Sequence, residues 1–370
     1  MAKYLWCSGA TDVTGQALAE ALNLELVKKK PRNLGRGDIV LGWGAKTKDD
    51  VNMGQAKVLN HPDKIRDNRN KFVTLQKLSE VRQLQNAIAP FKPANEIRRA
   101  IDRGEMTFPL VGRTNYHQGG KGFWLCLTLA HVDSAIQDGA QYFQSYADID
   151  TEYRLHVAFG KVIYAQKKVE NPTEEGWIAQ RKEKIETYAQ KNDVNLDNET
   201  VNYVLTRLVK EAVLPDRIVR SNRRGWKFSS VAPNNIIRDL KNAAVKSVEA
   251  MEMDFGAVDC AKRTDGTPMI IEINSGPGLQ RTAFDKYVEA FRAKIEELER
   301  GNVAQQAGRA ARNAVEANQE EAQPANDAPA AQEAGGGAGV INDAALAQLM
   351  NAVRTPDEAR RVLDIAMGRG

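Results

Sequence analysis

The sequence has 370 residues, of which 42% are hydrophobic and 27% are charged, a composition typical of a globular protein of about two or three domains. Its formal charge of +4 lacks the strong basic excess of a dedicated nucleic-acid-binding protein. Three cysteines without a CxxC spacing exclude a disulfide framework and a four-thiolate zinc site, and no apolar run approaches the ~20 residues that span a bilayer. We therefore expect a cytoplasmic protein that enters no membrane and does not depend on nucleic acid.

The first part of the chain predicts a strand followed by a helix. YLWCSGA (residues 4–10) is typical of a strand, and residues 11–23 carry apolar side chains at helical spacing. A second strand is predicted at DIVLGWG (residues 38–44), and the basic run KKKPR before it is expected in a solvated turn. Helices over residues 70–85 and 95–103 follow. This alternation indicates an α/β subdomain at the start of the chain.

A glycine-rich loop interrupts the next pair of predicted strands. A strand that ends in Arg113 is followed by HQGGKG (residues 117–122) and by another apolar run. Glycines let backbone amides approach a phosphate closely, and Lys121 adds a positive charge. The loop lacks the GK[ST] ending of a P-loop. A phosphate-binding loop and an ordinary hairpin loop both remain open, and His117 fits a loop residue better than a base.

A hairpin with basic side chains is predicted in TEYRLHVAFGKVIYAQKKV, residues 151–169. If Gly160-Lys161 forms a two-residue turn, Arg154 lies opposite Lys167, and His156 shares their face. Two facing cations repel each other unless an anion lies between them, which suggests a polyphosphate contact. The alternative is an exposed basic edge strand that is protected from aggregation.

A second, acidic hairpin is predicted in residues 253–279, where Asp265-Gly266 favours a two-residue turn. Pairing the residues that flank this turn sets Asp259 opposite Glu272, with Cβ atoms about 4.5–5.5 Å apart. Asn274 shares the face of Glu272, whereas Val258, Cys260, Ile271 and Ile273 are expected on the apolar face. Opposed carboxylates fit a divalent cation between them, and oxygen ligands favour Mg²⁺ or Mn²⁺. A solvated polar face is the alternative.

The end of the chain is predicted to contribute little core. Residues 301–340 contain no aromatic residue, Leu or Ile, so we expect a flexible Ala/Gly-rich linker there, with residues 304–316 able to prolong the preceding helix. Residues 341–370 are predicted to form two short helices, the second beginning at a capping box of Thr355 and Glu358. Two such helices would dock on a protein partner rather than fold alone.

The order of these elements resembles the ATP-grasp superfamily, and most closely its RimK-like branch of carboxylate–amine ligases. The resemblance covers about residues 1–298 and is strongest in DFGAVDCAKRTDGTPMIIEINSGPG, residues 254–278. It implies an α+β fold in which two α+β subdomains grip the nucleotide. The implied boundaries are residues 1–66 for the α/β N-terminal subdomain, 67–146 for the central lid subdomain and 147–300 for the catalytic subdomain.

The resemblance also implies roles for individual residues. Asp259, Glu272 and Asn274 match the positions that hold Mg²⁺ (or Mn²⁺) on ATP, and Lys71 matches the first nucleotide-binding Lys. Arg113 stands where the family usually has a second Lys, which keeps the charge but changes its geometry. Further nucleotide contacts are implied for His117, Gly119, Gly120 and Lys121 of the lid, for Gln144, Ser145 and Tyr146 of the hinge, for Asp148 at the ribose, and for Asn222. The implied catalytic residues are Arg154, Lys167 and Arg220.

The function that these features imply is an ATP-dependent carboxylate–amine ligase that forms an amide through an acyl-phosphate. A carboxylate and an amine acceptor, the latter a candidate peptide or protein, would be its substrates. An acid–thiol ligase, or another ATP-grasp ligase with a different nucleophile, is a second hypothesis. A non-catalytic ATP-binding assembly protein is a third. Residues 171–215 form a charged insertion that the resemblance does not align, so the two substrates stay unidentified.

Overall fold

The computed structural model describes residues 1–9, 12–116, 122–170, 199, 220 and 226–320, with side chains as far as Gly301. The chain divides into two compact units, Met1–Gly308 and Arg309–Gly370. The sheets and the pocket described below belong to the first unit, and of the second only the end of one helix is described. None of the described helices is both long enough and apolar enough to cross a membrane.

The N-terminal sheet is parallel and has the strand order β2-β1-β3-β4. It is built from β1 (Lys3–Cys7), α1 (Val13–Ala21), β2 (Glu25–Val27), β3 (Ile39–Trp43) and β4 (Lys57–Leu59). The predicted strand, helix and second strand are thus confirmed. The Asp12 carboxylate accepts a hydrogen bond from the Gly15 N–H (2.9 Å) and so caps α1.

The second sheet is antiparallel, with the order β5-β8-β6-β7. It follows α2 (Pro62–Arg69), α3 (Lys71–Ser79) and a 3₁₀ turn (Arg82–Ala87), and it comprises β5 (Phe91–Pro93), α4 (Ile97–Asp102), β6 (Leu110–Arg113), β7 (Phe123–Cys126), α5 (Leu129–Gln137) and β8 (Tyr142–Ser145). The helix predicted over residues 70–85 ends at Ser79, because Val81 adopts an extended conformation before the 3₁₀ turn. The β6–β7 hairpin confirms the predicted strand pair.

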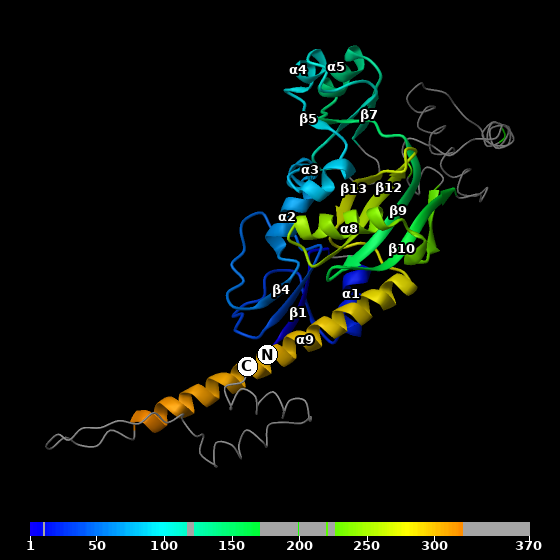
Figure 1. Cartoon of the computed structure of the whole chain (residues 1–370). Helices are drawn as coiled ribbons and strands as arrows, with labels where there is room; N and C mark the ends of the chain where they lie inside the picture. The colour runs from blue at the N-terminus through cyan, green and yellow to red at the C-terminus, as the bar shows by residue number, and fades with distance from the viewer. Residues whose placement is uncertain (10–11, 117–121, 171–198, 200–219, 221–225, 321–370) are drawn as a thin grey trace, which may run out of the picture. The chain divides into compact units, whose positions relative to one another are not determined.

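The third sheet is antiparallel and has five strands in the order β11-β10-β9-β12-β13. Its elements are β9 (Ile149–Ala158), β10 (Lys161–Glu170), β11 (Trp226–Val231), a 3₁₀ turn (Pro233–Asn235), α8 (Arg238–Ala250), β12 (Phe255–Arg263) and β13 (Pro268–Asn274). Helix α8 lies across one face of the sheet (Figure 1) and buries Leu240 and Ala244 against Val258 and Ile273. The opposite face carries polar side chains, among them Arg154 and Asp259, and the three sheets with their helices form the α+β fold.

The turn of the acidic hairpin differs from the predicted one. The Gly266 N–H donates to the Arg263 carbonyl (2.9 Å), and the Arg263 N–H donates to the Thr267 carbonyl (2.9 Å). The loop therefore has three residues and ends with Gly266 at φ +84°, a left-handed conformation that glycine adopts without strain. The predicted two-residue turn at Asp265-Gly266 is wrong.

A β-bulge in β13 restores the predicted pairing of the carboxylates. The ladder passes from Cys260 opposite Ile270 to Asp259 opposite Glu272, so Ile271 is the extra residue. The longer turn and the bulge shift the register by one residue each, in opposite senses. Consequently Ile270, not Ile271 as predicted, joins the core under α8, and Ile271 packs in a separate cluster.

The basic hairpin is also displaced by one residue from its prediction. Phe159 (φ +50°) and Gly160 (φ +75°) form its two-residue turn, and both positive φ angles are typical of a type I′ turn. A β-bulge between Val162 and Tyr164 then shifts the register by one residue, so that Arg154 lies opposite Gln166 and Lys167 lies opposite Tyr153. A one-residue shift moves a side chain to the other face of a sheet. The predicted pairing of Arg154 with Lys167, with an anion between them, is therefore wrong.

Buried contacts join the N-terminal sheet to the five-stranded sheet. The fully buried Asn60 amide accepts from the backbone N–H groups of Asp254 (2.7 Å) and Phe255 (3.1 Å) and donates to the Phe255 carbonyl (2.9 Å). At the end of β13, the Gly44 N–H donates to the Ser275 carbonyl (3.2 Å). These bonds hold the end of β3 beside the acidic hairpin.

Helix α9 (Thr282–Glu320) follows the acidic hairpin and packs against the N-terminal sheet. Its Tyr287 and Phe291 surround Trp43 of β3 and Phe255 of β12, with the Phe255 and Phe291 ring centres 4.7 Å apart. The helix continues to Glu320, so the first part of the segment expected as a linker is helical, because its many alanines favour that conformation. The rest of the linker and the predicted docking helices lie outside the described residues.

The backbones of Gly276 and Gly44 approach each other closely, which makes a side chain at Gly276 costly. A Cβ at Gly276 would lie 2.9 Å from both the Cα and the N of Gly44. We expect Gly276→Ala to lower the free energy of unfolding by about 1–3 kcal/mol in a denaturant titration. Gly278→Ala is the matched control, since nothing lies within 4 Å of its Cβ position. Equal unfolding midpoints for the two variants would contradict this assignment.

Candidate active site

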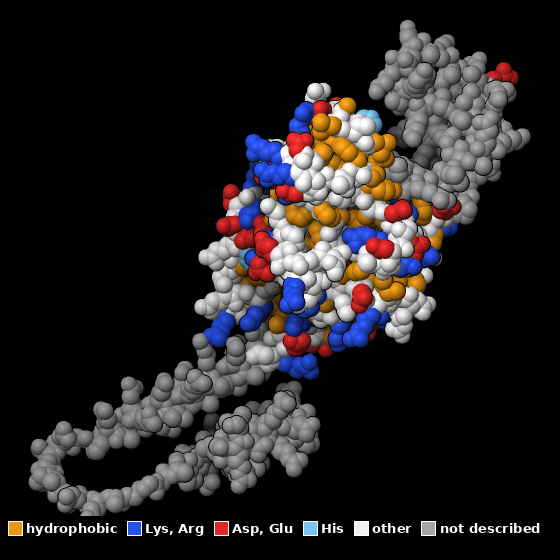
Figure 2. Space-filling view, turned by 45° about the horizontal axis from the view of Figure 1, so that its top comes forward, with side chains coloured by type: hydrophobic (Ala, Val, Ile, Leu, Met, Phe, Trp, Pro, Cys, Tyr) orange, Lys and Arg blue, Asp and Glu red, His pale blue; other side chains and the backbone are white. Residues whose placement is uncertain are grey.

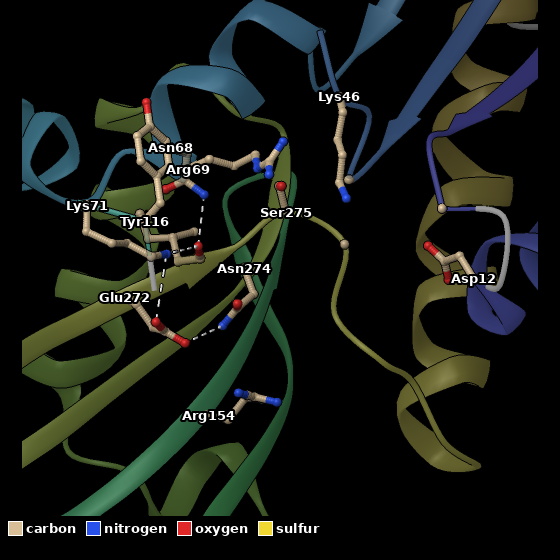
Figure 3. Close-up of a pocket in the computed structure, with 14 residues that line it drawn as sticks. Asp12, Lys46, Asn68, Arg69, Lys71, Tyr116, Arg154, Glu272, Asn274 and Ser275 are labelled. Atoms are coloured by element: carbon tan, nitrogen blue, oxygen red, sulfur yellow. Dashed lines mark hydrogen bonds and ion pairs between the residues drawn. The ribbon is translucent and has the colours of Figure 1, made fainter. Parts of the chain in front are cut away.

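A pocket of about 800 Å³ lies where the N-terminal sheet, the start of α3 and the end of the acidic hairpin meet. Figure 3 shows its polar side chains coming from all three parts. The residues that line it are Gly9, Asp12, Gly44, Lys46, Asn68, Arg69, Lys71, Tyr116, Arg154, Glu272, Ile273, Asn274, Ser275 and Gly276. Its volume is that of a small-molecule binding site.

The predicted metal ligands lie together beside this pocket. Asp259 and Glu272 face each other on β12 and β13, and the Asn274 amide donates to Glu272 Oε1 (3.3 Å) and, at 3.5 Å, to Asp259 Oδ2. Glu272 and Asn274 line the pocket, whereas Asp259 is 5% exposed and does not. The sequence thus correctly predicts that these three side chains lie together. The turn of the hairpin differs from the predicted one, and the bulge was not predicted.

Arg154 of β9 binds the buried carboxylate of Asp259 with two parallel hydrogen bonds. Its Nε lies 2.6 Å from Oδ1, and its Nη2 lies 2.7 Å from Oδ2, a bidentate geometry that strengthens the pair. The guanidinium carbon also lies 4.4 Å from the centre of the Phe228 ring. Burial by itself would raise the pKa of Asp259, but the charge and hydrogen bonds of Arg154 outweigh it and hold that pKa below its ordinary value.

Lys71 reaches the other carboxylate from the first residue of α3. Its Nζ lies 3.8 Å from Glu272 Oε2 and 3.5 Å from the Ile273 carbonyl oxygen. The side chain of Asn70 caps the helix by accepting from the Val73 N–H (3.3 Å), which sets where Lys71 begins α3. Arg113, at the end of β6, is half-buried beside Tyr142 and Glu272, and its partial removal from water lowers the pKa of its guanidinium.

The acidic pair fits a hard divalent cation by its donor chemistry. Two carboxylates and one amide oxygen are the ligand types that Mg²⁺ and Mn²⁺ prefer. Within the described part of the chain, no cluster of three His, Cys, Asp or Glu side chains could hold a metal ion, so the amide of Asn274 would complete the set. Both carboxylates already have a cationic partner: Asp259 pairs with Arg154, and Glu272 pairs with Lys71.

A second buried ion pair shares the face of Arg154. Lys168 pairs with Glu152, whose side chain is 9% exposed, and its Nζ lies 5.3 Å from the centre of the Phe228 ring. Burial raises the pKa of Glu152. The sequence prediction missed Lys168 because the register shift between Val162 and Tyr164 moves Lys167, which is exposed, to the other face. Recognising Phe159-Gly160 as the turn would not have identified Lys168 without this β-bulge.

The places of the two lysines predict unequal effects on stability for two neighbouring substitutions. Lys168→Met should lower the free energy of unfolding by about 3–5 kcal/mol, because it leaves Glu152 buried without its partner. Lys167→Met, the matched control, should change it by less than about 0.5 kcal/mol. Urea titrations at neutral pH measure both values, and a larger loss for Lys167→Met would refute the observed register.

His156 lies beneath the site and is 1% exposed. Its Nε2 contacts Gln166 Oε1 at 3.2 Å. Burial, reinforced by the charge of Arg154, lowers the pKa of His156 to about 4, so the imidazole is neutral at physiological pH.

The buried imidazole predicts a pH dependence of stability. Unfolding returns the pKa of His156 to about 6.5, so the unfolded chain binds the extra proton and the folded state loses stability as the pH falls from about 6.5 to 4. The loss that His156 causes should reach about 3 kcal/mol. His156→Gln should lack this component in urea titrations across that range. The exposed control His131→Gln should keep the wild-type pH slope, and equal slopes for both variants would exclude the role of His156.

The remaining predicted site residues either do not line this pocket or lie outside the described residues. Arg220 donates to the carbonyl oxygens of Ile149 (2.7 Å) and Asp150 (3.3 Å), and its guanidinium lies 4.9 Å from the Trp226 ring centre. The predicted nucleotide contacts Gln144, Ser145, Tyr146 and Asp148, at and just after the end of β8, do not line the pocket. His117, Gly119, Gly120, Lys121 and Asn222 lie outside the described residues.

Two pocket cations were not predicted as site residues. Lys46 follows β3, and Arg69 ends α2; both are exposed and have no acidic partner among the described residues. The acidic side chains of α2 are engaged elsewhere, since Asp63 contacts Arg66 and Asp67 binds Lys77. No sequence motif distinguishes these two cations, because their place in the pocket depends on the packing of the sheets.

Comparison with known proteins identifies similar solved structures. No protein-family model and no curated protein sequence matches the chain. The ATP-grasp ligase PsnB, solved with a minimal precursor, Mg and ADP, is 11% identical over 80% of this chain and 96% of its own, with a TM-score of 0.49. An ATP-grasp RimK-domain protein from Sphaerobacter thermophilus is 13% identical over 80% and 97%, with a TM-score of 0.46.

D-alanine–D-alanine ligase from Bacillus anthracis is similar to the same extent, at 11% identity over 82% of this chain and 97% of its own, with a TM-score of 0.49. PsnB and the RimK-domain protein are ATP-grasp proteins. They belong to the superfamily that the sequence motifs resemble.

Proposed function

We propose that this chain is an ATP-grasp ligase that joins a carboxylate to an amine at the expense of ATP. The observation that carries the proposal is the direct pairing of Asp259 with Glu272 beside a pocket that Lys71 and Arg154 also line. Opposed carboxylates destabilise a sheet unless cations compensate them. Acids and bases arranged in this way suit a metal–polyphosphate ligand, in which both signs of charge are present.

In the proposed site, one set of residues binds the metal ion and another binds the phosphates. Asp259, Glu272 and Asn274 would hold Mg²⁺ or Mn²⁺, which when bound supplies positive charge to the phosphate oxygens. Lys71, Arg113 and Arg154 contribute cations of the protein itself to the same phosphates. From the family resemblance we assign the adenine to the backbone of residues 144–146, the ribose to Asp148 and a further catalytic contact to Arg220. The lid residues 117–121 and Asn222 complete the proposed nucleotide site.

The proposed reaction needs no nucleophile from the enzyme. A substrate carboxylate oxygen attacks the γ-phosphorus of ATP, the bond from that phosphorus to the β–γ bridging oxygen breaks, and acyl-phosphate and ADP form. The amine then attacks the acyl carbon, phosphate leaves with the bonding electrons, and the amine loses a proton. The cations in the pocket stabilise the charge on the transferred phosphoryl group. All three cysteines are buried, in agreement with a reaction that uses no thiol.

Two isosteric substitutions test this proposal. Asp259→Asn and Glu272→Gln remove one negative charge each and should weaken Mg²⁺-dependent ADP binding in calorimetry. They should also lower ADP formation by about a hundredfold. Asp265→Asn, at the exposed turn of the same hairpin, is the matched control and should preserve both. Undiminished Mg²⁺-dependent nucleotide binding in both site variants would refute the proposed metal ligands.

The chemistry of the first step can be tested before the substrates are known. Hydroxylamine captures an acyl-phosphate as a hydroxamate, so a panel of amino acids and peptides with ATP, Mg²⁺ and hydroxylamine should yield hydroxamate and ADP in equal amounts. ADP formed only with a thiol acceptor would favour an acid–thiol ligase instead. Nucleotide binding without ADP formation over the whole panel would favour an assembly protein.

A further inference from the structure

We infer that Arg154 and Lys71 guard the acidic pair in the nucleotide-free protein, so that the site excludes a bare divalent cation and accepts one only together with a polyphosphate. This inference rests on the proposed function and concerns the selectivity of the same site. It assigns two states to each cation: paired with a carboxylate when the pocket is empty, and paired with phosphate when the nucleotide is bound.

Arg154 joins the buried carboxylate of Asp259 to the pocket. The carboxylate is 5% exposed and does not line the pocket, whereas Arg154, which occupies both of its oxygens, does. A metal ion that approaches from the pocket therefore meets a guanidinium before it meets Asp259. Positive charge repels positive charge, and the bidentate pair must open before the oxygens can bind the ion.

The other ligands are engaged in the same way. Lys71 Nζ lies 3.8 Å from Glu272 Oε2, and both side chains line the pocket. The Asn274 amide points its Nδ2 toward both carboxylates, and a cation would require the amide to turn its oxygen inward. All three metal ligands are thus satisfied by groups of the protein and need a local rearrangement before they can bind a metal.

Charge balance explains why the nucleotide is needed for this rearrangement. Asp259 and Glu272 are neutralised by Arg154 and Lys71, so the four groups together carry no net charge. A bare divalent cation would displace both basic groups and leave them next to a metal ion, with no anion in return. A polyphosphate supplies that anion, and both basic groups already line the pocket that would receive it. The Phe228 ring centre lies 4.4 Å from the guanidinium carbon of Arg154 and limits how far the guanidinium can move on that side.

Binding of the metal and of the nucleotide should therefore be strongly cooperative, and the cooperativity should depend on Arg154. We would measure binding of Mn²⁺ by electron paramagnetic resonance with and without ADP. In the wild type, Mn²⁺ alone should bind weakly, and ADP should tighten it by about tenfold or more. In Arg154→Met, Mn²⁺ alone should bind about tenfold more tightly than in the wild type, and the additional tightening by ADP should shrink.

Arg69→Met is the matched control, because Arg69 lines the same pocket but has no acidic partner among the described residues. It removes the same charge from the pocket and should change the affinity for bare Mn²⁺ much less than Arg154→Met does. Lys71→Met removes the contact of Lys71 with Glu272, the more exposed of the two carboxylates. This variant serves as the test if Arg154→Met does not fold. It should also tighten bare Mn²⁺.

Thermal unfolding supplies a second readout that does not depend on activity. Mn²⁺ without nucleotide should raise the unfolding temperature of Arg154→Met or Lys71→Met more than that of the wild type. The inference is overturned if the wild type binds Mn²⁺ with ADP but neither variant binds bare Mn²⁺ more tightly than Arg69→Met does. Failure of the wild type to bind Mn²⁺ even with ADP would instead refute the proposed function, so the two failures are distinguishable.

Discussion

The bidentate contact between Arg154 and the buried carboxylate of Asp259 is the interaction on which the site face of the five-stranded sheet depends. A carboxylate with so little access to water is stable only when a cation and hydrogen bonds compensate its desolvation. The neighbouring pair of Glu152 and Lys168 repeats this arrangement, and Phe228 contacts the cations of both pairs. The polar face of the sheet is therefore a set of matched charges rather than a solvated surface.

The pocket exists because the N-terminal sheet is held against the end of the acidic hairpin. The Asn60 amide makes three hydrogen bonds to the backbone at the start of β12, and the Ser275 carbonyl accepts from the Gly44 N–H at the end of β13. Helix α9 then returns to pack its aromatic side chains around Trp43. Lys46, which follows β3, and Arg69, which ends α2, consequently line one pocket with Glu272.

Bulk charge gives little indication of this organisation. Lys, Arg, Asp and Glu side chains are intermixed over the face shown in Figure 2, in agreement with the formal charge of +4. Inside the pocket, four basic side chains, Lys46, Arg69, Lys71 and Arg154, are gathered with the carboxylates of Asp12 and Glu272. Charges of both signs in one pocket suit a ligand that itself carries both signs.

The sequence by itself determined the order of the elements and the presence of the acidic hairpin, because strand periodicity and turn-forming glycines are local properties. Asp259 lies opposite Glu272, as predicted, only because the bulge at Ile271 offsets the longer turn. It did not determine the turn at Phe159-Gly160, since a positive φ at Phe159 is disfavoured locally, nor the register shift between Val162 and Tyr164. That shift decided that Lys168, not Lys167, shares the face of Arg154. Tertiary structure alone decided the partners of the buried charges and the place of Lys46 and Arg69 in the pocket. Those contacts join segments that are far apart in the chain. Buried charges there need partners of opposite sign, and local conformational propensity does not decide which residues these partners are.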